Sequence, residues 1–235
     1  MISTLEKEIT LRYLKTRKKD GFLNIISIFS FIGISLGVAV LIIVMSVMNG
    51  FRTELINKIV GFNAHIVVQP YNDKIDIKNV NITDINSISK NLVLSNSGEV
   101  IIINEDKSKG VLVRGYLSED FRNLDIIQNE NFLGEKDNLN NNHISISKEL
   151  TFTLGLEIED NITIMSSTGI ETIIGNLPKQ KTFTVVSLFE SGLADFDNNI
   201  IFMNLKTLEN FIGLNSKNRK LEIYLSNPQK IENQK

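Results

Sequence analysis

The sequence contains no cysteine and no tryptophan, and only two histidines and three prolines occur among its 235 residues. Without cysteine the chain forms neither disulfide bonds nor thiolate metal sites, and it offers no thiol nucleophile. The histidines, His65 and His143, stand in no metal-ligand spacing such as His-Glu-x-x-His, so we interpret both as ordinary strand residues. We therefore expect the chain to use no metal and no cofactor.

Catalytic motifs are missing as well. Ser167, Ser187 and Ser191 lack the Gly-x-Ser-x-Gly turn that presents the nucleophile of many serine hydrolases. No Gly-x-x-x-x-Gly-Lys-Ser/Thr motif occurs, so any ATP hydrolysis is expected from a separate subunit. We predict that the chain is not an enzyme.

Residues 52–235 show no marked cluster of basic side chains, and the formal net charge of the whole chain is only -2. A nucleic-acid-binding protein usually carries a clustered basic face, so we expect no nucleic-acid partner. The acidic residues Glu190, Asp195 and Asp197 lie close together, but they lack the alternating oxygen ligands of a calcium loop. This cluster is interpreted as a solvated turn.

Residues 21–51 contain no charged side chain and form a long hydrophobic run. As a helix rising about 1.5 Å per residue, this run exceeds the hydrocarbon core of a bilayer, which is about 30 Å thick. A cleaved signal peptide has a shorter apolar region that ends at a small-residue site. We predict a retained transmembrane helix over residues 21–51.

The flanks of this helix predict its orientation. The N-terminal side is rich in basic residues, whereas Arg52 and Lys58 are the first two after the helix, so the positive-inside rule places the N-terminus in the cytoplasm. The basic residues before the helix are Lys7, Arg12, Lys15, Arg17, Lys18 and Lys19. Residues 1–20 also place Ile2, Leu5, Ile9 and Tyr13 on one helical face, which favours a short helix in the inner interface; the alternative is a solvated basic leader.

One face of the predicted transmembrane helix carries small side chains along its first half and bulkier apolar side chains along its second half. Ser30, Gly33 and Gly37 would allow a second helix to approach closely, because packing rather than hydrophobicity drives association in lipid. The half of this face with bulkier side chains is typical of a helix that borders an apolar space. Its residues are Val40, Ile43, Val44, Val47 and Met48.

Residues 52–235 predict a mixed outer domain, so the fold class is α+β with an N-terminal transmembrane α-helix. Runs rich in β-branched residues predict strands, and apolar residues at helical spacing predict helices. The predicted strands are 64–69, 99–103, 110–114, 143–146, 161–165, 181–188, 199–202 and 221–225, and the predicted helices are 82–90, 148–154 and 205–211. Two connections, 123–142 and 166–180, are long, which is typical of functional or mobile loops.

The second connection is interpreted as a hairpin arm that docks a partner. Its apolar side chains, together with Pro178, would be poor choices for an idle solvent loop. Lys179 and Lys181 give its base a positive charge that favours an acidic partner surface. The alternative is that the apolar residues fold back onto the domain's own core. The apolar residues of the arm are Ile170, Ile173, Ile174 and Leu177.

Several segments resemble the LolC/LolE family, the permease subunits of the bacterial lipoprotein-releasing ABC transporter. The resemblance begins with RYLKTRKKDGF at 12–22 and ISIFSFIGISLGVAVLIIVMSVMNGF at 26–51, and continues with GFNAHI at 61–66 and VLVRGY at 111–116. It extends through residues 143–163, LPKQKTFTVVSLFESGLADFD at 177–197 and LEIYL at 221–225.

The resemblance implies a MacB-like periplasmic domain with a porter-like and a second mixed subdomain, held in the inner membrane. It implies LolD-like ATPase subunits, a second permease copy or paralogue, lipoprotein substrates and a LolA-like periplasmic carrier as partners. It also implies that the bulkier stripe of the helix faces acyl chains and that the hairpin arm hooks the carrier, as in LolC-type members.

Family members continue through three further membrane helices, so we expect this chain, which stops at Lys235, to be a fragment. Two alternatives remain open: a single-pass anchored binding or sensor module, and another MacB- or FtsX-type transporter subunit. The sequence does not distinguish a LolC-type from a LolE-type permease.

Overall fold

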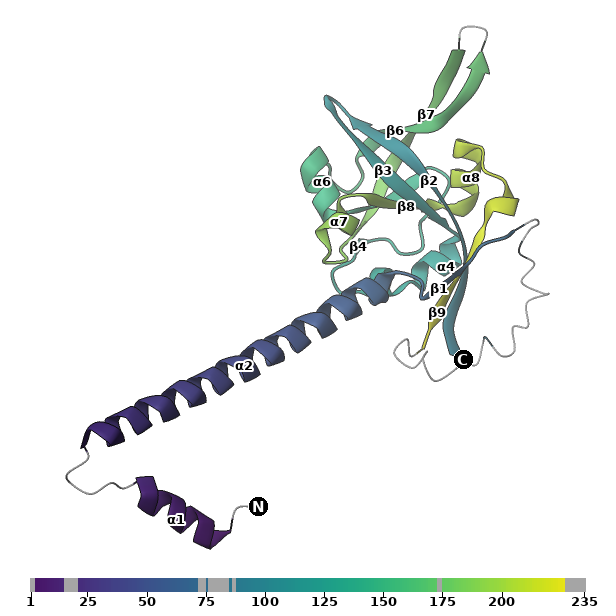
Figure 1. Ribbon diagram of the computed structural model, residues 1–235. Helices are drawn as coiled ribbons and strands as arrows, with labels where there is room; N and C mark the ends of the chain where they lie inside the picture. The colour runs from purple at the N-terminus through teal and green to yellow at the C-terminus, as the bar shows by residue number, and fades with distance from the viewer. Residues whose placement is uncertain are drawn as a thin grey trace. The chain divides into compact units, whose positions relative to one another are not determined.

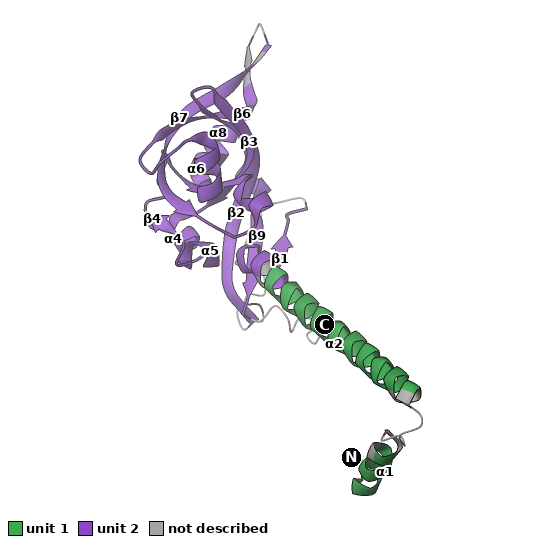
Figure 2. Cartoon of the chain, turned by 90° about the vertical axis from the view of Figure 1, so that its left-hand side faces the viewer, with its two compact units in different colours: residues 1–55 green, residues 56–235 purple. Residues whose placement is uncertain are grey.

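The computed structural model describes residues 3–14, 21–71, 75, 85, 88–172 and 175–226. The chain divides into two compact units, residues 1–55 and residues 56–235 (Figure 2). Each unit has its own internal organisation, so they are described in turn.

Unit 1 is helical. Helix α1 (Thr4–Leu14) starts with a reciprocal cap, in which Ser3 N donates to Glu6 Oε2 at 2.8 Å and Glu6 N donates to Ser3 Oγ at 3.2 Å. Helix α2 (Gly21–Phe62) contains the hydrophobic run, and its stretch Ile25–Ile56, in which an 18-residue window reaches a mean hydropathy of 2.8, is long and apolar enough to cross a membrane. The helix continues past residue 51 to Phe62, since residues 52–60 contain no glycine or proline, and where its membrane-spanning part ends stays a prediction.

In unit 2, strand pairings close a ring of six strands in the order β2, β3, β8, β5, β7, β6 and back to β2. Their bounds are β2 Ser89–Asn104, β3 Lys107–Tyr116, β5 His143–Ser147, β6 Asn161–Thr172, β7 Gly175–Phe189 and β8 Ile200–Asn204. Closure pairs both edges of each strand within the ring and leaves an interior of a size that side chains can fill.

The interior of the ring is packed with aliphatic side chains from alternate strand positions, such as Val100 and Ile102 of β2 and Val111 and Val113 of β3. Helices α6 (Lys148–Leu154) and α8 (Leu205–Ile212) directly follow the antiparallel strands β5 and β8, so they cover opposite ends of this core. The close approach of α8 depends on Gly115, because a Cβ there would lie 2.7 Å from Leu208 Cδ2.

A second, aromatic-rich core lies on the outer face of the ring and includes Phe62, Tyr116, Phe189 and Phe202. It is covered by the short elements α4 (Ser118–Arg122), α5 (Asp125–Gln128) and α7 (Ala194–Asp197), while β4 (Leu133–Gly134) pairs with β7. Beyond the ring, β9 (Lys220–Leu225) pairs with the first half of β2, and β1 (Ile66–Val68) pairs with β9. The 3₁₀ turn η1 (Ser216–Asn218) precedes β9.

The predicted α+β class is confirmed. All eight predicted strands overlap observed strands, and the helices predicted at 148–154 and 205–211 are present. The helix predicted at 82–90 falls mostly outside the described residues, and its end is wrong because Ser89 and Lys90 belong to β2. Residues 56–235 form one compact unit whose core contains two main hydrophobic clusters, and the predicted division into a porter-like and a second mixed subdomain stays a prediction.

Candidate docking site at the β6–β7 hairpin

The long connection predicted at 166–180 is a β-hairpin. Strands β6 and β7 remain paired from Asn161 with Thr184 as far as Thr172 with Gly175. The pairing of β6 with β2 ends at Ser166, so beyond this residue β6 pairs only with β7. Figure 1 shows this two-stranded part, residues 169–178, extending beyond the rest of the domain, and we call it the arm.

The side chains of the arm that the structure describes point into solvent. Leu177 is 54% exposed, and Pro178 beside it is exposed as well. The alternative that Leu177 folds back onto the core is therefore wrong. Ile173 and Ile174 lie outside the described residues; for Ile170 only the backbone is described, paired with Leu177.

A hollow of about 600 Å³ lies at the base of the arm, between β7 and helix α8. Its wall on the β7 side is basic, and among the described residues that line it none carries a carboxylate. Lys181 is held in place because its Nζ donates to the backbone oxygen of Asn141 at 3.2 Å and lies 5.1 Å from the centre of the Phe183 ring. The lining residues are Asn141, Pro178, Lys179, Gln180, Lys181, Thr207, Asn210 and Phe211.

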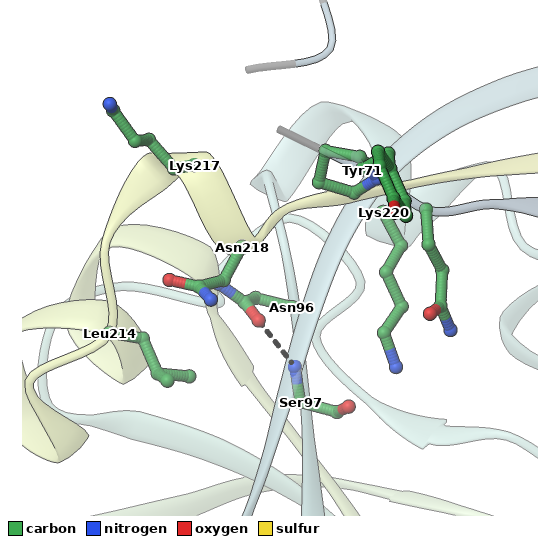
Figure 3. Close-up of a pocket in the computed structure, with 9 residues that line it drawn as sticks. Tyr71, Asn96, Ser97, Leu214, Lys217, Asn218 and Lys220 are labelled. Carbon is green, nitrogen blue, oxygen red and sulfur yellow. Dashed lines mark hydrogen bonds between the residues drawn. The ribbon is translucent and has the colours of Figure 1, made fainter. Parts of the chain in front are cut away.

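A second hollow, of about 460 Å³, is lined by Gln69, Pro70, Tyr71, Asn96, Ser97, Leu214, Lys217, Asn218 and Lys220 (Figure 3). Behind it, Arg219 Nε and Nη2 donate to the two carboxylate oxygens of Glu209 at 2.7 and 2.8 Å. Burial opposes ionisation of Glu209, but the bonds from Arg219 and Asn96 outweigh it and lower its pKa. The lining polar groups show no convergence on a single ligand position.

A buried polar cluster that the sequence did not predict joins strands β2, β3 and β9. The Glu222 carboxylate accepts hydrogen bonds from Ser95 Oγ at 2.5 Å, Tyr116 OH at 2.9 Å and Tyr224 OH at 3.0 Å. Burial, and then the charge of Glu222, raises the pKa of Tyr116. The alternation of LEIYL would place Glu222 and Tyr224 on one strand face, which is the only sequence signal for this cluster.

The acidic turn differs from its predicted solvated form. Asp197 is buried, and its carboxylate accepts hydrogen bonds from Ser191 N at 2.9 Å and Gly192 N at 3.1 Å. Glu190 pairs with Lys148 at 3.1 Å instead of joining a cation site. Among the residues that the structure describes, no group of three or more His, Asp or Glu side chains is placed to hold a metal ion.

A family model described as the MacB-like periplasmic core domain matches residues 27–233. The chain belongs to this family. The match includes α2 from residue 27 onward together with the whole described part of unit 2.

Curated relatives of this MacB-like chain include LolC proteins. The lipoprotein-releasing system transmembrane protein LolC of Neisseria meningitidis serogroup B is 29% identical over 96% of this chain and 55% of its own length. The corresponding protein of Xylella fastidiosa strain Temecula1 is 26% identical over 91% of this chain and 52% of its own. LolE of Haemophilus influenzae is 46% identical over only 24% of this chain. The chain spans about half the length of the LolC relatives, and the resemblance to the LolC/LolE family is confirmed.

The predicted residues of the membrane helix share one stripe, because α2 is continuous through all of them. At about 100° per residue they fall within an arc of about 140°. They are Ser30, Gly33, Gly37, Val40, Ile43, Val44, Val47 and Met48, and all are exposed. Residues on other faces, such as Ile34 and Ile42, are exposed too, so what each face contacts stays a prediction.

Proposed function

We propose that this chain is the N-terminal part of a permease subunit of an ABC transporter that extracts lipoproteins from the inner membrane and passes them to a periplasmic carrier. The observation that carries the proposal is the similarity to LolC proteins across 96% of the chain. In this proposal the MacB-like domain lies in the periplasm, and the N-terminus with α1 lies at the cytoplasmic face.

The permease works within a complex. LolD-like subunits supply ATP hydrolysis, and a second permease copy or paralogue packs against the small-residue face of α2, formed by Ser30, Gly33 and Gly37. The bulkier half of the same stripe, from Val40 to Met48, lines a space for the acyl chains of the lipoprotein.

The arm is the docking element for a LolA-like carrier. Leu177 and Pro178 present apolar surface near the base of a projecting hairpin, and a domain without a partner would gain nothing by exposing it. Lys179 and Lys181 at its base attract an acidic carrier surface and accelerate encounter. Ile170, Ile173 and Ile174 are assigned to the same apolar contact from their place in the sequence.

The substitution Leu177→Asp, which introduces a negative charge, tests this proposal. A carboxylate at the centre of an apolar contact is desolvated without a partner, so carrier affinity is expected to fall about tenfold to a hundredfold. Affinity is measured by surface plasmon resonance with the full chain in nanodiscs and a purified LolA-like carrier from the same bacterium.

The matched control is Phe152→Asp, since Phe152 of helix α6 is 86% exposed and lies on an element away from the arm (Figure 1). This variant should bind the carrier like the parent chain. A second variant lacking residues 169–177 should lose binding while keeping the circular dichroism of the domain. Unchanged affinity in both Leu177→Asp and the folded deletion contradicts docking through the arm.

A further inference from the structure

The arm departs from the ring at an irregularity in strand pairing. The register runs regularly up to Met165 opposite Gln180 and resumes with Gly169 opposite Pro178. Three residues of β6, 166–168, therefore oppose only Lys179 of β7. An insertion of this kind bends a strand and increases its twist, so this point sets the direction in which the arm leaves the domain.

The side-chain hydroxyl groups of Ser166 and Thr168 form hydrogen bonds at this irregularity. Thr168 Oγ1 donates to the backbone oxygen of Ile212 at 2.5 Å, and Thr168 N donates to Ser166 Oγ at 3.1 Å. Ser166 Oγ and Thr168 Oγ1 are 2.9 Å apart. Because a hydroxyl has one proton and that of Thr168 is used on Ile212, Ser166 must be the donor in this last bond. A directed chain runs from Ser166 through Thr168 to Ile212.

The last acceptor of this hydrogen-bond chain, the backbone oxygen of Ile212, is held in place by its surroundings. Ile212 is the last residue of α8, where the carbonyl groups have no partner within the helix. Gly213 follows in the left-handed conformation at φ 81° and ends the helix. The Ile212 side chain is buried in the core of the ring and packs so closely on β2 that a Cβ at Gly98 would lie 2.5 Å from its Cδ1.

This hydrogen-bond chain joins α8 to β6, and β6 pairs with β7, which forms one wall of the basic hollow. Residues 178–181 of β7 form one wall, and Thr207, Asn210 and Phe211 of α8 form the other. We propose that the Ser166–Thr168–Ile212 hydrogen-bond chain is a positioning anchor that fixes the arm relative to α8 and so keeps the docking hollow in one shape. This inference rests on the proposed docking function of the arm.

An anchor matters here because a two-stranded ribbon is only marginally stable by itself. Without the bond from Thr168, the arm would sample several directions, and the carrier would bind only the competent fraction. Thr168 itself is exposed and water competes for its hydroxyl, so the expected effect is a modest loss of affinity, about threefold to tenfold.

Thr168→Val tests the anchor, because valine keeps the branched shape and removes the hydroxyl. The chain has no cysteine, so Leu177→Cys on the arm and Lys206→Cys on α8 can be spin-labelled without background. Electron–electron double resonance on the full chain in nanodiscs should show a broader distance distribution in Thr168→Val than in the parent pair. Thr168→Ser should restore the narrow distribution.

Carrier affinity is measured in parallel on the unlabelled chains carrying the same substitutions at Thr168. The matched control is Thr153→Val on α6, which removes an equivalent exposed hydroxyl bonded to the Glu149 backbone at 2.9 Å and should change neither readout.

The outcomes separate the anchor from the docking function. An unchanged distance distribution in Thr168→Val overturns the anchor, whatever the carrier does. A broader distribution with unchanged carrier affinity overturns its role in docking. A broader distribution in a chain whose parent does not bind the carrier upholds the anchor and rejects the docking function.

Discussion

At the scale of single residues, the most constrained charge in the domain is that of Glu222. Its side chain belongs to a residue that is 5% exposed, and three hydroxyl groups donate to its carboxylate. A buried carboxylate is tolerated only with such partners, because removing it from water without them costs several kcal/mol. The cluster joins β2, β3 and β9 through one carboxylate.

This cluster predicts a loss of stability at alkaline pH. Burial raises the pKa of Tyr116 and Tyr224 above the ordinary value of about 10. Above that pH the unfolded chain releases the phenolic protons while the folded chain retains them. The free energy of unfolding therefore falls as pH rises, by about 1.4 kcal/mol per pH unit for each tyrosine.

In Tyr224→Phe the free energy of unfolding should fall less steeply with pH, because only one of the two tyrosines still contributes its roughly 1.4 kcal/mol per pH unit. At pH 8 the same variant should be less stable than the parent by about 1–2 kcal/mol, because it loses the hydrogen bond to Glu222. The measurement is urea unfolding of the full chain in detergent, followed by circular dichroism from pH 8 to 11. Tyr71→Phe is the control, since Tyr71 is 97% exposed and should leave the slope unchanged. An identical slope in Tyr224→Phe and the parent contradicts the prediction.

At the scale of elements, helix α2 carries one stripe whose two halves differ in side-chain size. Residues 25–51 of this helix are exposed on every face within the described chain, and in a membrane we expect lipid, substrate or another helix to surround them. The assignment of the bulkier half to acyl chains rests on the proposed transport function.

Photo-crosslinking tests this assignment. A benzoyl-phenylalanine at Val44 or Met48 should capture lipoprotein in cells, because these positions face the proposed acyl space. The same group at Ile34 or Ile42, on other faces of α2, should capture several times less. Equal capture from all four positions would show that the stripe has no special role.

At the scale of the whole molecule, the orientation in the membrane is the property on which the proposed function depends. The basic residues before α2 and their scarcity after it favour a cytoplasmic N-terminus. A carrier in the periplasm can reach the arm only with the domain on that side.

Single cysteines introduced into this cysteine-free chain test the orientation. Phe152→Cys in the MacB-like domain should react with a membrane-impermeant maleimide once the outer membrane is permeabilised. Leu5→Cys in α1 should react only after the inner membrane is opened. Both sites are exposed in the structure, so the reverse pattern would mean that the orientation is wrong.

Local patterns in the sequence determined the elements. The charge-free run predicted α2, and β-branched runs predicted eight of the nine strands in the described residues, all except the two-residue β4, since hydrophobicity and side-chain branching act over a few residues. The length of the segment at 166–180 pointed to a hairpin, and the lysines at its base could be named from the sequence.

Only the tertiary structure decided what these elements enclose. Closure of the ring depends on β2 pairing with β6, and the anchor joins Thr168 to Ile212 across 44 residues. The hydrogen bonds to the Glu222 carboxylate likewise depend on Ser95 and Tyr116, which are 127 and 106 residues away in the sequence. A hydroxyl or carboxylate carries no sequence signal for the group it will meet, because chain folding alone brings the two together.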